Sequence, residues 1–252
     1  LSKAGYAIPK GIASIERVNA ILNAENDLTE TDDPKSIGEF KDKIEIKGLH
    51  FSYDETREIL TDINLTVPKG KMIALVGQSG SGKSTLLYSI SGMDEITGGE
   101  VLFDGENLSN MEEEQRAQLR LKKMGFVFQN PQMLKTLTVL DNIMLPGFVA
   151  KEEEADIIRK RAVRLMEEMD ISQIADRDIR NVSGGQLQRA AICRAMINNP
   201  DVLFMDEPTG ALDSNTGKQV METLKNLSKE KLVIIVSHDR EFAEIYGDRI
   251  VE

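Results

Sequence analysis

An apolar run, a glycine-rich turn and a helical pattern follow one another in residues 72–92, and this stretch constrains the fold most. Residues 72–76 read Met-Ile-Ala-Leu-Val, which is typical of a buried strand, and helical spacing resumes after the turn. Glycines in the turn let successive backbone N–H groups curl around a phosphate, and the following helix directs the positive end of its dipole there. The turn matches G-x-x-x-x-G-K-[ST] at every fixed position and consists of Gly77, Gln78, Ser79, Gly80, Ser81, Gly82, Lys83, Ser84 and Thr85. The sequence therefore predicts a phosphate-binding loop (P-loop, residues 77–85) and a nucleoside triphosphate site.

Charged and hydroxyl side chains add chemistry to this predicted site. Lys83 is placed to reach the β- and γ-phosphates, and the Ser84 hydroxyl is a suitable Mg²⁺ ligand. A second apolar run, residues 202–206, ends in Asp206 and is followed by Glu207. Because ligands of parallel sheets bind at the carboxyl ends of the strands, both acids are expected at the edge where the P-loop lies. Asp206 suits Mg²⁺ bound through water, and Glu207 suits a general base that polarises an attacking water.

Composition limits the classes of partner. The 252 residues carry a net charge of −11, which argues against a nucleic-acid backbone as the main partner, since such binding relies on Lys and Arg. The single cysteine, Cys193, allows no disulfide framework and fits a reducing compartment. No apolar run approaches the roughly 18 residues of a membrane-spanning helix, and no signal peptide is visible. The chain begins at Leu1 rather than Met, which indicates a piece of a longer protein.

The sequence pattern and composition change at about residue 43. Before it, apolar residues at helical spacing predict an amphipathic helix over residues 12–22, which either docks on a domain surface or ends a preceding helical region. Residues 25–42 have the acidic and polar composition of a linker, so residues 1–42 are predicted to form a separate N-terminal unit. In residues 43–252, predicted strands alternate with helical patterns, which indicates an α/β domain with a largely parallel sheet. The predicted strands cover residues 44–53, 63–67, 72–76, 101–103, 124–128, 202–206 and 232–236.

Residues 130–200 have a mostly helical pattern and interrupt this alternation. One apolar stripe at helical spacing contains Ile158, Ala162, Leu165, Met166 and Met169. Further on, the run Ser183-Gly184-Gly185-Gln186 opens another helical pattern. By itself this run fits either a plain N-cap and turn or a helix start whose exposed N–H groups bind an anion.

Taken together, these motifs resemble those of the ATP-binding cassette family, the nucleotide-binding domains of ABC transporters. The resemblance covers about residues 43–252, and the order and spacing of six features make it specific. Val182 stands where the family usually has leucine, a mild departure that leaves the site intact. The six features are the P-loop, Gln129, the signature (Ser183-Gly184-Gly185-Gln186), the acids Asp206 and Glu207, the D-loop (Ala211-Leu212-Asp213) and His238.

The resemblance implies a P-loop NTPase fold, with an antiparallel β subdomain and an inserted helical subdomain, at about residues 130–200, beside the mostly parallel core sheet. It implies ATP and Mg²⁺ as cofactors, with Ser84, Gln129 and Asp206 at the metal. It places Lys83, Glu207 and His238 in catalytic positions. The nucleotide-binding residues that it implies are Tyr53, Gly77 to Thr85, Gln129, Ser183 to Gln186 and Asp213.

Three side chains receive specific roles from the resemblance. Tyr53 would stack on adenine; the alternative is a core aromatic at the end of a strand. Gln129 would join Ser84 at Mg²⁺ and sense the γ-phosphate; the alternative is a surface loop glutamine. His238 would bond the γ-phosphate and hold it against Glu207.

In this family two domains dimerise head to tail, so that ATP lies between the P-loop of one chain and Ser183 to Gly185 of the other. The resemblance implies that ATP holds the dimer together and that hydrolysis releases it. It further implies a transmembrane permease as the partner that this cycle drives. The chain is therefore expected at the cytoplasmic face of a membrane, with no nucleic-acid partner.

Two branches of the family are represented in different parts of the chain. Residues 1–85 resemble an exporter with a fused membrane half, on the strength of the run Ala13-Ser14-Ile15-Glu16-Arg17-Val18. Beyond Leu86 the chain resembles the stand-alone ATPases of lipoprotein-release and antimicrobial-peptide-resistance exporters, through residues 91–94, 125–130 and 207–213. A natural mosaic or an engineered chimera would explain why the two parts of the chain resemble different branches.

Two other functions compete with the exporter ATPase. The first is a soluble, non-transport cassette ATPase that acts on nucleic acid or ribosomes. DNA-repair cassettes insert a long coiled coil between P-loop and signature, whereas Lys83 and Ser183 are only 100 positions apart and no heptads are sustained between them. The second is a small-molecule P-loop kinase, against which the signature and His238 argue.

Overall fold

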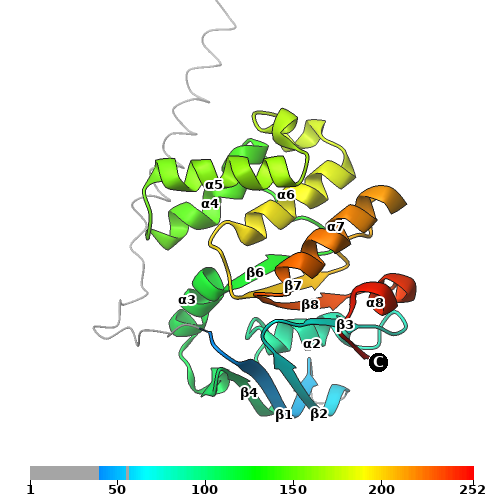
Figure 1. Cartoon of the computed structure of the whole chain (residues 1–252). Helices are drawn as coiled ribbons and strands as arrows, with labels where there is room; N and C mark the ends of the chain where they lie inside the picture. Colours follow the sequence, from blue (N-terminus) through cyan, green and yellow to red (C-terminus); the bar gives the residue numbers. More distant parts are fainter. Residues whose placement is uncertain (1–39, 55–56) are drawn as a thin grey trace, which may run out of the picture. The chain divides into compact units, whose positions relative to one another are not determined.

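Two sheets organise residues 40–54 and 57–252, the residues that the computed structural model describes (Figure 1). The helix predicted over residues 12–22 and most of the predicted linker lie outside this described part. Among the described residues, no helix combines the length and hydropathy needed to cross a membrane.

The larger sheet is parallel throughout and has the strand order β6-β7-β8-β3-β9. Every residue of β3, β7 and β8 is buried, which explains their uninterrupted apolar sequences, since parallel sheets are covered on both faces. The largely parallel sheet predicted from the sequence is confirmed. Its strands are β3 (Met72–Leu75), β6 (Met124–Val127), β7 (Val202–Asp206), β8 (Leu232–Val236) and β9 (Arg249–Val251).

The smaller sheet is antiparallel and has the order β2-β1-β4-β5. Its strands are β1 (Lys43–Ser52), β2 (Glu58–Pro68), β4 (Gly98–Phe103) and β5 (Glu106–Asn107). Burial alternates along β1 until the ladder shifts register between Ile46 and Leu49. The turn between β4 and β5 has positive φ at both Asp104 (53°) and Gly105 (90°), as a two-residue hairpin turn requires. This sheet is the antiparallel part that the family resemblance implied.

Gly99 lies where β4 approaches the irregular part of β1. Its φ is +82°, and a Cβ there would lie 2.1 Å from the Gly48 carbonyl oxygen. We therefore expect Gly99→Ala to destabilise the fold by about 3 kcal/mol or more, because a steric clash adds to the cost of a positive φ. Gly105→Ala is the matched control: its φ is also positive, but a Cβ there meets nothing within 4 Å. Chemical denaturation measures both variants, and equal losses would contradict the steric explanation.

Seven α-helices lie within the described residues: α2 (Lys83–Ile90), α3 (Glu113–Lys123), α4 (Val139–Ala150), α5 (Ala155–Glu168), α6 (Gly184–Met196), α7 (Ser214–Leu227) and α8 (Arg240–Tyr246). Three short 3-10 helices accompany them, η1 (Leu108–Asn110), η2 (Ser172–Ile174) and η3 (Ile179–Asn181). Between β6 and β7 the chain forms α4, α5 and α6, which confirms the mostly helical block predicted there. The predicted apolar stripe faces inward, with Ile158, Ala162 and Met166 buried on α5.

Both faces of the parallel sheet are covered, because successive residues of a strand point into different cores. On β7, Leu203 and Met205 join a core built with α4 to α7, whereas Val202 and Phe204 join a core built with α2 and the antiparallel sheet. Figure 1 shows α4, α5 and α6 on one side of the parallel strands and the antiparallel sheet on the other. Helix α2 packs between the two sheets and contributes Leu86, Leu87 and Ile90 to the second core.

Candidate functional site

The P-loop connects β3 to α2 and leaves the start of the helix open. Gly82 is the N-cap of α2 with a left-handed φ of 87°, and a Cβ there would lie 3.1 Å from the Leu60 side chain. No side chain caps this helix, and its first turn contains no acid. The first N–H groups of a helix have no intrahelical partner, so this uncapped start is suited to bind an anion.

The Lys83 ammonium lies over the P-loop. Its Nζ donates to the carbonyl oxygens of Gly77 (2.9 Å) and Gln78 (2.7 Å) and to Ser81 Oγ (3.2 Å). The positive charge is therefore held beside the glycine turn, where the uncapped helix start also favours negative charge. The Lys83 ammonium and the uncapped start of α2 therefore suit the negative charge of a triphosphate.

Asp206, at the carboxyl end of β7, is buried with 4% of its surface exposed. Tyr88 on α2 donates its hydroxyl to Asp206 Oδ2 at 3.1 Å. Burial, together with the negative charge of Asp206, raises the pKa of Tyr88 to about 12. The phenol therefore stays protonated and donates to the carboxylate at neutral pH.

The carboxylate of Glu207 lies between two side chains from neighbouring strand ends. The Gln129 amide donates to Oε2 at 3.2 Å, and His238 Nε2 lies 2.7 Å from Oε1. Because β6, β7 and β8 are adjacent and parallel, the residues just after each strand meet at one edge of the sheet. The sequence placed His238 near Glu207, but it placed Gln129 beside Ser84 and gave no sign of the bond to Glu207.

The backbone of Glu207 is unusual for a residue with a side chain. Its φ is 51°, in the left-handed region that favours glycine. The Glu207 N–H donates to the Val236 carbonyl (3.0 Å), and the Glu207 carbonyl accepts from the Gly210 N–H (3.2 Å). These bonds hold the residue in this conformation, which is the kind of strain that gathers at functional positions.

The signature forms the start of α6. Ser183 is the N-cap and exchanges two hydrogen bonds with Gln186, which is a capping box, so the predicted N-cap is confirmed. A Cβ at Gly184 would lie 3.9 Å from the Ala211 Cβ, and one at Gly185 would lie 3.3 Å from the Leu212 side chain. The signature and the D-loop are therefore neighbours.

Asp213, at the end of the D-loop, caps the following helix. Its carboxylate accepts the N–H groups of Asn215 and Thr216 at 3.1 Å and the Thr216 hydroxyl at 2.6 Å. The hydrogen bonds from Thr216 hold the pKa of Asp213 below its usual range. The structure thus places the side chains of Asp213 and Gln186 in helix caps rather than at the P-loop of this chain.

Tyr53 lies just beyond the end of β1 and is 69% exposed. Its ring makes an edge contact with Phe51, at 4.8 Å between centroids, and its hydroxyl lies 3.3 Å from Thr85 Oγ1. The alternative of a core aromatic is therefore wrong. An exposed ring beside the first turn of α2 is free to stack on a planar base.

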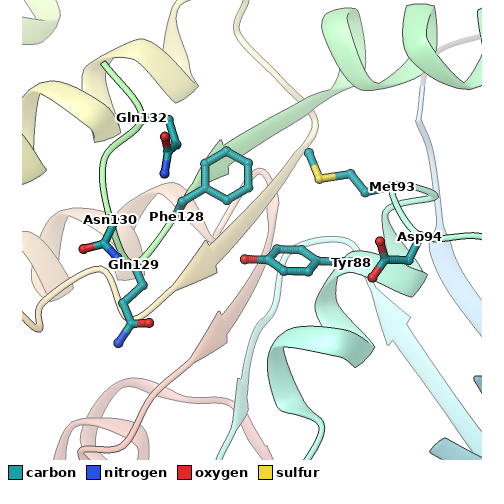
Figure 2. Close-up of a pocket in the computed structure, with 7 residues that line it drawn as sticks. All are labelled: Tyr88, Met93, Asp94, Phe128, Gln129, Asn130 and Gln132. Carbon is teal, nitrogen blue, oxygen red and sulfur yellow. The ribbon is translucent and has the colours of Figure 1, made fainter. Parts of the chain in front are cut away.

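An open cavity of about 380 Å³ is lined in part by Gln129, the side chain that donates to Glu207 (Figure 2). Figure 2 shows the Tyr88 ring between Asp94 on one side and Phe128 and Gln129 on the other. The sequence gave no signal for this cavity, because its walls come from α2, from the segment after it and from the segment after β6. The lining residues are Tyr88, Met93, Asp94, Phe128, Gln129, Asn130 and Gln132.

Comparison with known proteins finds relatives over most of the described residues. The uncharacterized ABC transporter ATP-binding protein YbbA of Escherichia coli (strain K12) is 45% identical over 187 residues, 73% of this chain and 82% of that protein. The macrolide export ATP-binding/permease protein MacB of Shewanella sp. (strain W3-18-1) is 38% identical over 213 residues. That match takes in 83% of this chain but only 33% of the MacB protein.

Solved structures share the fold. A dimeric structure of MJ0796, an ABC transporter cassette, has a TM-score of 0.78 and 35% identity, and the match covers 82% of this chain and 93% of that one. A second dimeric MJ0796 structure, in a post-hydrolysis state with ADP and Pi bound, matches with a TM-score of 0.78, 34% identity and the same coverage. A family model described as ABC transporter matches residues 60–210. These similarities show that the chain belongs to the ABC transporter family, as an ATP-binding and ATP-hydrolysing cassette.

Proposed function

We propose that this cassette powers an exporter, by hydrolysing ATP between two head-to-tail cassettes that work beside a transmembrane permease. The similarity to a dimeric cassette and to a macrolide export protein named as both ATP-binding and permease supports the proposal. The permease would hold the chain at the cytoplasmic face of the membrane.

The observation that carries the hydrolytic part is the Glu207 carboxylate beside Gln129 and His238. A water at this edge would give its proton to Glu207 while its oxygen attacks the γ-phosphorus, and the bond from that phosphorus to the bridging oxygen of ADP would break. Lys83 and the first N–H groups of α2 would bind phosphate oxygens and balance their charge. His238 would hold the γ-phosphate against Glu207.

The side chains of Asp206, Ser84 and Gln129 offer the carboxylate, hydroxyl and amide oxygens that Mg²⁺ prefers together with water. Within residues 40–54 and 57–252, no group of three or more His, Cys, Asp and Glu side chains is placed to hold a metal ion alone. Since Mg²⁺ commonly binds through one or two carboxylates plus substrate phosphates, we expect it to enter with ATP. When bound, it would neutralise charge on the phosphates.

The signature supports a site shared between two chains. Gly184 and Gly185 form the first turn of a 13-residue helix, whose N–H groups are suited to an anion. Within the described part of the chain, no hydrogen bond or ion pair joins residues 183–186 to the P-loop. The P-loop already has its own helix start and Lys83, so a second anion-binding helix start makes most sense over the γ-phosphate of another copy.

Mixing two inactive variants tests this arrangement. Lys83→Ala and Ser183→Arg homodimers each have two broken sites, so each is expected to be inactive. In a mixed dimer both lesions fall in one site and the other site is intact, so we expect up to about half of the normal ATPase activity per dimer by double-mutant logic. Crosslinking quantifies the mixed dimers, at high protein concentration because dimer formation depends on protomer concentration.

A single-chain tandem with both lesions in the same half is the control. Shared sites predict no activity, because each site then has one lesion, whereas cassettes that work alone predict about half. Active mixed dimers with an inactive tandem support the shared site, and the reverse pair of results excludes it. Two inactive proteins would mean that both sites must be intact for either to work.

The cavity beside Gln129 is our proposed contact for the permease. Gln129 lines the cavity and donates to Glu207. A permease segment bound in the cavity would therefore contact a side chain that is hydrogen-bonded to the proposed base. Its walls combine apolar surface from Met93 and Phe128 with the charge of Asp94. Such a mixed lining suits a short polypeptide segment with both apolar and polar side chains.

A further inference from the structure

We propose that Tyr88 is a positioning residue for the hydrolysis reaction, whose hydroxyl fixes the carboxylate of Asp206 in the orientation that receives Mg²⁺. The inference rests on the proposed function, because it takes Asp206 as the side chain that serves the metal. Tyr88 belongs to none of the six motif features and is five positions beyond Lys83 on the same helix.

The first argument is the isolation of the Asp206 carboxylate. The side chain is buried, and a buried carboxylate needs hydrogen-bond donors in place of water. In the described part of the chain, the Tyr88 hydroxyl is the single side-chain donor recorded for it, at 3.1 Å from Oδ2. This bond selects one orientation of the carboxylate and leaves Oδ1 for another ligand.

The second argument is that the Tyr88 ring is itself held in place. Its helix packs between the two sheets, and its ring lies 6.1 Å from the Phe128 ring, centroid to centroid. Phe128 in turn contacts Phe126, which stacks on Phe204 of β7 at 5.3 Å. The strand that carries Asp206 and the ring that orients it therefore belong to one aromatic cluster.

The third argument is the proximity of Tyr88 to the phosphate site. Lys83 begins α2 and Tyr88 lies near its end, so one rigid helix carries both the ammonium over the P-loop and the donor to Asp206. Partners that orient a metal ligand commonly contribute 10- to 100-fold in metal affinity, by order of magnitude. We expect the Tyr88 hydroxyl to contribute about tenfold, the lower end of that range, because Mg²⁺ is also held by ATP.

The test is Tyr88→Phe, which removes the hydroxyl and keeps the ring. The measured quantity is the affinity for a non-hydrolysable ATP analogue over a series of Mg²⁺ concentrations and in EDTA. Mg²⁺ is expected to raise the affinity for the analogue. In Tyr88→Phe we expect the Mg²⁺ concentration that gives half of this increase to be about tenfold higher, and the affinity measured in EDTA to be unchanged. Tyr246→Phe, on α8 and outside the site, is the matched control and should change neither value.

Asp206→Asn completes a double-mutant cycle. If Tyr88 acts through Asp206, Tyr88→Phe has no further effect on the Mg²⁺ requirement once Asp206 is replaced. An unchanged requirement in Tyr88→Phe, an equal loss of affinity in EDTA, or a full effect in the Asp206→Asn background would each overturn the proposal. If Asp206→Asn alone leaves the Mg²⁺ requirement unchanged, the metal role of Asp206 in the proposed function fails instead, and the Tyr88 proposal fails with it.

Discussion

Glu207→Gln is expected to lower ATP hydrolysis by roughly 100-fold or more while ATP binding persists, the usual scale of a lost general base. The amide has the size of the carboxylate but cannot accept a proton from water. It also cannot accept hydrogen bonds on both sides, so one of the contacts with Gln129 and His238 weakens. Single-turnover hydrolysis and equilibrium ATP titration separate the two effects, and an ATP-held dimer should become visible by size-exclusion chromatography.

Glu168→Gln is the matched control, because this carboxylate pairs with Arg164 on the surface of α5, away from the strand ends. It should leave turnover unchanged. Near-normal turnover in Glu207→Gln would move the proton acceptor elsewhere, and His238, 2.7 Å from Glu207, would be the first candidate.

Lys83→Ala is expected to abolish turnover and to weaken ATP binding by about 10- to 100-fold, the scale of a lost charge-assisted hydrogen bond. The ammonium lies over the P-loop on the carbonyls of Gly77 and Gln78, so its removal leaves the phosphate charge unbalanced there. Nucleotide titration measures the binding, and circular dichroism confirms an unchanged fold. Lys160→Ala, at an exposed position on α5, is the control. Wild-type affinity in Lys83→Ala would contradict the P-loop interpretation.

Three strands of the parallel sheet, β3, β7 and β8, were predictable because burial on both faces leaves their sequences apolar, apart from Asp206 at the end of β7. The run Met72–Leu75 and the runs before Asp206 and Ser237 show this, and each appears as a strand within a residue of its predicted bounds. Strand β9, which begins with the exposed Arg249, lacks this pattern. The P-loop was predictable for a different reason: its function needs glycine and lysine at fixed local spacing. Both signals are local, so the sequence carries them without knowledge of the fold.

The family resemblance already placed His238 near Glu207, but the contacts that Gln129 and Tyr88 make with the two acids were not predictable, because they depend on how the strands and α2 pack. Gln129 meets Glu207 only because β6 lies beside β7, and the two residues are 78 positions apart. Tyr88 meets Asp206 across 118 positions, through the packing of α2 against the sheet. The two-residue strand β5 was missed because it is too short to show a period.

The left-handed backbone of Glu207 has a consequence for selection. A residue with a Cβ at φ 51° costs on the order of 1 kcal/mol relative to glycine, and asparagine tolerates this region better than glutamate does. Glycine and asparagine would relax the backbone at this position but remove the carboxylate proposed as the base, and aspartate, which also tolerates this region, would draw the carboxylate back by one methylene. Stability and turnover are opposed at this one residue. A screen of this chain for heat resistance alone would favour variants that have lost ATP hydrolysis.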